Sequence, residues 1–145
     1  MSNADRRAGF TLLELAAVML IVALVATLAV LMTRGSGRSE LKAVTLQAAA
    51  LLRRERFGAL LTGRERAVSL DGVSRTLIGD GGDVVAIPRD ITLDVLSAQQ
   101  EAPILTVVRF HPDGASTGAA LRFSREKVRY EIRVNWYTGW VAIAE

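Results

Sequence analysis

One carboxylate stands at the start of a long apolar run. Glu14 is the only charged side chain between Leu12 and Met32. A carboxylate at mid-bilayer is unfavourable by roughly 2.5–3.5 kcal/mol, so such residues usually have a cationic partner. Glu14 could instead reach the lipid headgroups, or gain from the positive end of the helix dipole. The residue type alone leaves pairing and these passive roles open.

Other chemically reactive side chains are sparse. His111 is the single histidine and cysteine is absent, which argues against a histidine or thiolate metal site and excludes a disulfide. Asp80 and Asp83 in "GDGGD" could bind Ca²⁺, but two carboxylates fall short of the roughly 6–8 oxygens that it takes. That loop also lacks the lysine of a phosphate-binding loop, and no G-x-S-x-G motif is present. We therefore expect no metal, no cofactor and no enzymatic activity.

The apolar run predicts a membrane helix. From Leu15 to Met32 there are 18 residues without a charge, and Thr27 is the only polar one. At about 1.5 Å per residue they span about 27 Å, close to the hydrocarbon core of a bilayer. The run is longer than the apolar part of a secretory signal, and no clear A-x-A cleavage pattern follows it. A plain membrane anchor fits the length but leaves Glu14 unexplained.

The residues before the run give Glu14 a context. A short basic leader ends in Gly9, and Phe10 begins the stretch "FTLLE" that opens the helix. This order resembles the class III signal of type IV pilins and pseudopilins. The resemblance implies that residues 1–9 are a leader, removed by a prepilin peptidase after Gly9, and that Phe10 is then N-methylated. It also implies that residues 10–32 form the transmembrane and assembly helix, in which Glu14 pairs with the N-terminal amine of a neighbouring subunit.

Residues 33–66 are predicted to form a linker and an amphipathic continuation helix. The glycines and serines of "TRGSGRSE" indicate a break, after which Ser39 could cap a new helix with Glu40 in its first turn. Apolar residues then recur with helical spacing up to a stop at Thr62-Gly63. Residues 34–66 carry eight basic side chains against three glutamates. We expect the arginines to form a solvated face, although such a segment also suits anionic lipids, acidic proteins or nucleic acid.

Residues 67–145 alternate with a period of two and contain no helical pattern. Asp71-Gly72 predicts a hairpin, "ILTVVRF" a strand, and Thr138-Gly139 a turn within the last strand pair. We expect Trp136, Tyr137 and Trp140 to lie partly in the core, with any exposed ones available for partner contact. The predicted class is α+β: a long N-terminal helix packed on an antiparallel β-sheet, or on two small sheets.

The C-terminal half extends the resemblance. "FHPDGASTGAALRF" and "YEIRVNWYTGWVAI" look like the closing region of the H-type minor pseudopilin of type II secretion, shared with minor pilins of the FimT and FimU kind. That family often has a basic residue after the Thr-Gly pair, where this chain has Trp140. The absence of cysteine, and of a proline around residues 28–32, favours a minor subunit over a major one.

The resemblance implies a protein-transport role by assembly. It predicts a single-pass protein of the bacterial inner membrane whose β domain, residues 67–145, lies in the periplasm near the tip of a pseudopilus. Its partners would be major and minor pseudopilins, the prepilin peptidase and the inner membrane. The alternative is a minor type IV pilin of the FimT or FimU kind, in pilus assembly or DNA uptake, so nucleic acid is disfavoured but stays open as a partner. An unprocessed membrane-anchored domain is the remaining alternative.

Overall fold

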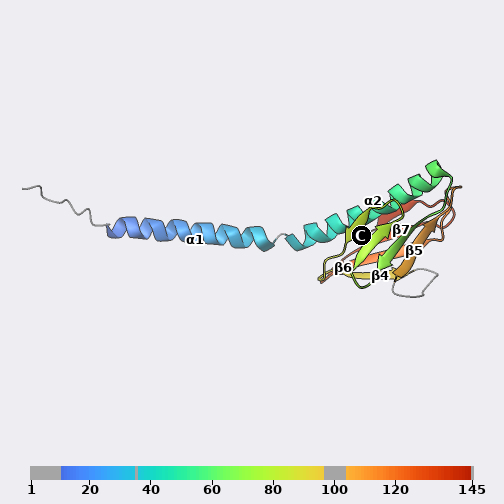
Figure 1. Cartoon of the computed structure of the whole chain (residues 1–145). Coiled ribbons are helices and arrows are strands. Elements are labelled where there is room, and N and C mark those ends of the chain that lie inside the picture. Colours follow the sequence, from blue (N-terminus) through green and yellow to red (C-terminus); the bar gives the residue numbers. More distant parts are fainter. Residues whose placement is uncertain (1–10, 35, 97–103, 145) are drawn as a thin grey trace, which may run out of the picture. The chain divides into compact units, whose positions relative to one another are not determined.

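The structure is a computed structural model that describes residues 11–34, 36–96 and 104–144 (Figure 1). It divides into two compact units, Met1–Ser36 and Gly37–Glu145. Among the described residues, the first unit contains one long helix, and the second contains a helix and two sheets. Gly9 and Phe10, the predicted cleavage site, lie outside the described residues.

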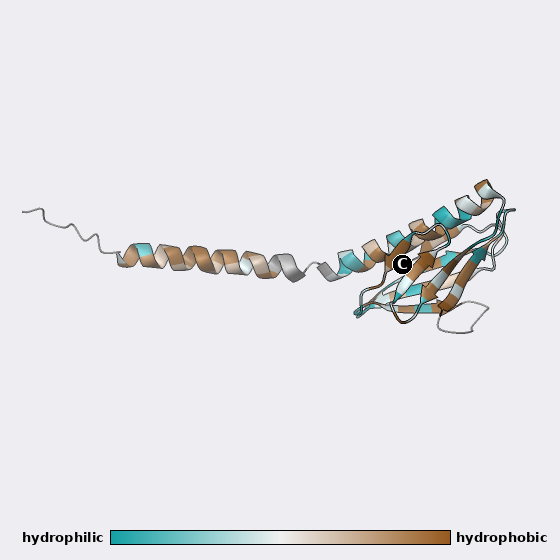
Figure 2. Cartoon of the chain, in the orientation of Figure 1, coloured by the Kyte–Doolittle hydropathy of each residue, from teal (hydrophilic) through white to brown (hydrophobic). Residues whose placement is uncertain are grey.

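The first unit contains helix α1, Leu12–Arg34. Its Leu12–Val30 portion has a mean hydropathy of 2.6, and by length and composition it is able to cross a membrane. Brown, hydrophobic residues cover it in Figure 2. Thr27, the polar exception, donates its hydroxyl to the carbonyl of Ala23 at 2.8 Å, so the helix satisfies this group internally. The predicted apolar helix is therefore present.

Helix α2, Ser36–Thr62, opens the second unit. It begins before Ser39, so the prediction that Ser39 caps this helix is wrong. The predicted end is confirmed: Gly63 has a φ of +63°, and its N–H donates to the carbonyl of Ala59 at 3.0 Å. A left-handed residue that closes the last turn in this way is a common helix terminator, and glycine adopts it without strain.

Eight strands form two antiparallel four-stranded sheets in the described part of the second unit. The first sheet has the order β3-β2-β1-β5, with β1 at Arg66–Asp71, β2 at Thr76–Gly79, β3 at Val84–Ala86 and β5 at Ile104–Phe110. The second has the order β4-β6-β7-β8, with β4 at Thr92–Leu96, β6 at Ala119–Arg125, β7 at Val128–Val134 and β8 at Val141–Ala144. The predicted pilin-like α+β class is confirmed in its two-sheet form.

The core lies between the buried face of α2 and both sheets. From the helix it takes Leu41, Val44, Ala48, Ala49, Leu51, Leu52 and Ala59. The strands add large side chains such as Phe110 and Phe123, both fully buried. Val107 and Val108 are both buried although neighbours on a strand normally face opposite sides, because the pairing of β5 with β1 shifts by one residue there.

The predicted Asp71-Gly72 hairpin is present but uses a longer turn. β1 and β2 pair with Asp71 opposite Thr76, and the positive φ in the loop, +53°, belongs to Arg75. Asp71 accepts hydrogen bonds from the Ser74 hydroxyl at 2.7 Å and the Val73 N–H at 2.9 Å. The hydroxyl bond is the main reason that the pKa of Asp71 is lowered, and the backbone bonds add to it.

A buried carboxylate joins α2 to the first sheet. Glu55 is fully buried; its Oε1 accepts the N–H of Gly81 at 3.0 Å, and its Oε2 lies 3.4 Å from Nη1 of Arg66. A Cβ on Gly79 or Gly81 would lie 2.5 Å or 2.7 Å from Oε1. Gly79 and Gly81 of "GDGGD" are therefore needed because the loop closes around the Glu55 carboxylate.

Glu55→Gln is expected to lower the free energy of unfolding by about 1–2 kcal/mol, since the amide keeps an acceptor for Gly81 but loses the charge facing Arg66. Urea denaturation of the full chain in detergent measures this change. Glu40→Gln is the matched control, because Glu40 pairs with Arg125 at 2.8 Å while its side chain is 47% exposed. Exposed pairs contribute about 0–1 kcal/mol. Equal losses in the two variants would contradict a special role for the buried carboxylate.

Candidate assembly site

The start of α1 places Glu14 in the first helical turn. The backbone N–H of Glu14 lies 3.2 Å from the Thr11 hydroxyl, which accepts from it, and the Thr11 carbonyl accepts from Leu15 at 3.1 Å. Thr11 is thus the N-cap of the helix. With glutamate three residues later, the pair has the spacing of a capping box. This local role was not anticipated from the sequence.

The Glu14 carboxylate itself is exposed. The large apolar side chains of the same helix are exposed as well, from Leu12 at 86% to Val30 at 51%. A helix that exposes so many large apolar side chains needs lipid or other helices around it.

The arginines of α2 lie at the solvent-exposed surface, as the sequence predicted, and three of them also bind other parts of the domain. Arg53 donates to the Val141 carbonyl at 3.2 Å and Arg56 to the Thr138 carbonyl at 3.1 Å, so both hold the β7–β8 region. Arg54 lies 2.6 Å from Asp83. These contacts anchor the arginines to the domain, while the charge of Arg53 and Arg56 stays without an ion-pair partner among the described residues.

Trp136, Tyr137 and Trp140 are 68%, 72% and 65% exposed, so the expectation that they lie partly in the core is wrong. β7 ends at Val134, and the turn that follows carries all three outward. The turn forms because the Asn135 side chain accepts the N–H groups of Tyr137 and Thr138 at 2.9 and 3.0 Å.

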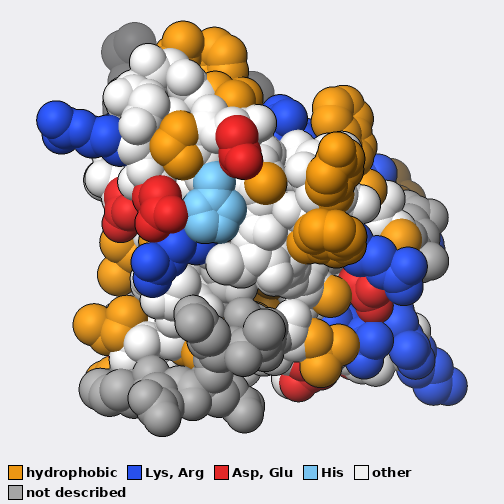
Figure 3. All heavy atoms as spheres, turned by 90° about the vertical axis from the view of Figure 1, so that its right-hand side faces the viewer, with side chains coloured by type: hydrophobic (Ala, Val, Ile, Leu, Met, Phe, Trp, Pro, Cys, Tyr) orange, Lys and Arg blue, Asp and Glu red, His pale blue; other side chains and the backbone are white. Residues whose placement is uncertain are grey.

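The remaining polar candidates belong to local networks. His111 Nδ1 lies 2.8 Å from Glu65 Oε1, and Arg109 lies 3.6 Å from the same carboxylate. Figure 3 shows the histidine between acidic side chains, with a group of hydrophobic side chains on the same face. Asp80 accepts the N–H of Ala67 at 2.7 Å. In the ranges that the structure describes, no group of three or more acidic or histidine residues could hold a metal.

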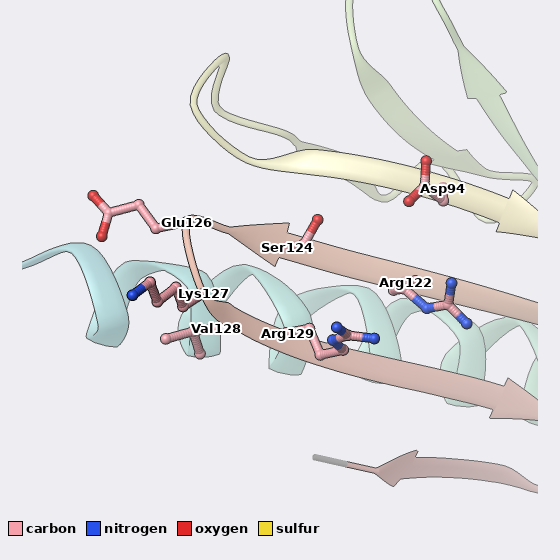
Figure 4. A pocket seen from close by; sticks show the side chains of 7 residues that line it. All are labelled: Asp94, Arg122, Ser124, Glu126, Lys127, Val128 and Arg129. Carbon is pink, nitrogen blue, oxygen red and sulfur yellow. The ribbon is translucent and has the colours of Figure 1, made fainter.

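The outer face of the second sheet has a shallow polar hollow of about 320 Å³. Its lining comprises Asp94, Arg122, Ser124, Glu126, Lys127, Val128 and Arg129, shown in Figure 4. Arg122 lies 3.1 Å from Glu131, whose pKa is lowered chiefly by hydrogen bonds from Arg133 and then Arg122. The hollow thus holds both signs of charge.

Comparisons with known proteins found a matching family model for the N-terminal segment and a relative that matches most of the chain. Residues 5–30 match the family described as the prokaryotic N-terminal methylation motif. Over 136 residues the chain is 29% identical to type II secretion system protein H of Xanthomonas campestris pv. campestris, covering 92% of this chain and 80% of that protein. The chain is thus similar to an H-type pseudopilin over most of its length. The methylation motif covers the predicted cleavage site and most of α1.

Two solved structures share the fold of this chain. The minor pseudopilin EpsH from the Type 2 Secretion System of Vibrio cholerae matches with a TM-score of 0.58 at 16% identity, over 72% of this chain and 96% of that one. The type IV minor pilin FimU of Pseudomonas aeruginosa matches with a TM-score of 0.55 at 14% identity, over 74% and 90%. At these identities the two matches speak for the pilin-like fold, which pseudopilins and minor pilins share.

Proposed function

We propose that this chain is the H-type minor subunit of a type II protein secretion system, and that it joins a periplasmic pseudopilus near its tip. The observation that carries the proposal is the joint match of the N-terminal methylation motif and of protein H over most of the chain. Its single N-terminal apolar helix and folded C-terminal unit fit a single-pass anchor. The proposal places that helix in the inner membrane and residues 67–145 in the periplasm. The chain acts by assembly and not by catalysis.

Maturation is the first step of the proposal. A prepilin peptidase removes residues 1–9, methylates Phe10, and leaves Glu14 as the fifth residue of the mature chain. α1 then packs among the helices of other major and minor pseudopilins, which removes its exposed apolar side chains from lipid. The Glu14 carboxylate pairs with the N-terminal amine of the neighbouring subunit, because opposite charges attract strongly where water is scarce.

Mass spectrometry of the chain from cells with an active prepilin peptidase tests this step. We expect an N-terminal peptide that begins with N-methylated Phe10. In cells without the peptidase, the leader peptide should stay attached. An intact Met1 in the presence of the peptidase would show that the chain is an unprocessed membrane-anchored domain.

A minor pilin that binds DNA is the second candidate. Lys127 and Arg129 beside the polar hollow favour it, since clustered cations neutralise phosphates. The engagement of Arg53, Arg54 and Arg56 within the domain weakens it. We expect no retardation of DNA by the full chain in detergent in a gel-shift assay at low salt. Retardation that disappears with added salt, and that is lost in a Lys127→Ala, Arg129→Ala double variant, would favour the pilin function instead.

A further inference from the structure

We propose that Trp136, Tyr137 and Trp140 form a preformed docking surface, the aromatic turn, for an acidic segment of another pilin-like subunit. This inference rests on the proposed function and names a contact within it. The three side chains are each about two-thirds exposed. Large aromatic side chains that are left in solvent on a rigid turn are typical anchors of protein interfaces.

The aromatic turn is held in place from several sides. Asn135 accepts the Tyr137 and Thr138 N–H groups, and the Gly139 N–H donates to the Asn135 carbonyl at 2.8 Å. The rings of Trp136 and Tyr137 meet edge to face, with centroids 5.6 Å apart. A turn that is already ordered loses little conformational entropy on binding, so more of the contact energy appears as affinity.

Neighbouring loops and α2 complete the support. The Trp136 carbonyl accepts the Ser116 N–H at 2.8 Å, and a Cβ on Gly118 would lie 3.1 Å from the Trp136 Cβ. Trp136 therefore stands directly over Gly118. On the other side, Arg56 donates to the Thr138 carbonyl. These contacts fix the backbone from which the aromatic side chains project.

The charge around the aromatic turn selects the occupant. Arg53 and Arg56 bind backbone carbonyls, and no carboxylate of the described chain forms an ion pair with either. Arg133, two residues before Asn135, is 71% exposed. Its partner Glu131 is shared with Arg122. Arg53 and Arg56 therefore keep an unneutralised positive charge beside the turn, which is complementary to an acidic protein segment.

Single-stranded nucleic acid is the competing occupant, since aromatic rings and arginines also stack on bases. The observations favour protein for two reasons. Residues 135–140, which form the turn, contain no cationic side chain. The hydrogen bonds of Arg53 and Arg56 to backbone carbonyls hold their charges at fixed positions, which suits a fixed carboxylate better than a flexible phosphate backbone.

The chain offers a direct probe because both of its tryptophans lie in the aromatic turn. Full-length mature protein in detergent, labelled with 5-fluorotryptophan, should give two ¹⁹F signals that report on this surface alone. The binding partners tested are purified pseudopilins from the same organism, added one at a time, and a poly-dT oligonucleotide. We expect one pseudopilin to shift or broaden both signals, and the oligonucleotide to leave them unchanged.

Variants separate anchoring from charge. Tyr137→Ala should weaken that binding at least about tenfold, as expected for an interface anchor. Val73→Ala, at a residue 88% exposed in the β1–β2 turn, is the control and should leave affinity unchanged. The Arg53→Gln, Arg56→Gln double variant keeps hydrogen-bond donors but loses charge. It should weaken binding about threefold or more and reduce its salt dependence.

Three outcomes would overturn the proposal. In the first, another pseudopilin co-purifies with the chain while both ¹⁹F signals stay unchanged. This result would disprove the docking surface and leave the proposed function intact. Signals that respond to the oligonucleotide and to no pseudopilin assign the surface to nucleic acid. Failure of every pseudopilin to associate with the chain removes the proposed function as well.

Discussion

Glu14→Ala is expected to leave cleavage after Gly9 intact and to reduce incorporation into the pseudopilus at least about tenfold. Removing one partner of a buried ion pair is unfavourable by about 3–5 kcal/mol, because the other charge stays desolvated and unpaired. Here the unpaired group would be the N-terminal amine with which we propose that Glu14 pairs. Incorporation is measured by cross-linking or co-purification with other pseudopilins from membranes, and cleavage by the mass of the mature chain.

Glu14→Gln separates this role from capping. The Thr11-x-x-Glu14 spacing is that of a capping box, in which glutamine replaces glutamate without loss. If Glu14 only caps α1, Glu14→Gln should assemble normally and Glu14→Ala poorly. If the carboxylate pairs with an amine, both variants should fail, because the amide carries no charge. Normal incorporation of both variants would mean that Glu14 has no role in assembly and only lies near the lipid headgroups.

Thr11→Ala completes the comparison. It removes the cap hydroxyl and keeps the carboxylate, so helix stability should fall by about 1 kcal/mol. Incorporation should change little beside the effect of Glu14→Ala. A defect as large as that of Glu14→Ala would mean that the geometry of the first turn, rather than charge, controls assembly.

Features with a strong local signal were predictable from the sequence. The uncharged run implied α1 because a helix is the simplest way to satisfy the backbone in an apolar medium. "ILTVVRF" corresponds to β5 without a shift, and Gly63 ends α2 as predicted. In each case neighbouring residues alone decide the conformation.

Features that depend on distant contacts were not predictable. Glu55 lies in an arginine-rich helix, and only the folded sheet shows that Gly79 and Gly81 close around it. Arg53 and Arg56 have the pattern of solvated residues, yet carbonyls more than 80 positions away bind them. Trp136 continues the strand alternation, but Asn135 turns the chain before it. Such outcomes follow from tertiary hydrogen bonds that no local pattern encodes.

Gly139→Ala is expected to lower the free energy of unfolding by about 2–4 kcal/mol, through backbone strain and a steric clash. The φ of Gly139 is +62°, where an L-residue is unfavourable by about 1–2 kcal/mol. An added Cβ would also lie 2.4 Å from the Gly114 carbonyl and 3.0 Å from Nε of Arg56. The first of these atoms belongs to the backbone, so the turn itself must move.

Gly63→Ala isolates the strain, because Gly63 has a φ of +63° and nothing within 4 Å of an added Cβ. It should lose only about 1 kcal/mol, and the difference between the two variants then measures the clash. Thermal or urea unfolding of the full chain in detergent gives both values. Because the clash would push the Thr138 carbonyl away from Arg56, Gly139→Ala should also move the emission of Trp136 and Trp140, whereas Gly63→Ala should not. If both variants lose the same stability and leave the tryptophan emission unchanged, the aromatic turn is more flexible than its hydrogen bonds indicate. A flexible turn would lose conformational entropy on binding. It would then lack the advantage on which its proposed role in docking depends.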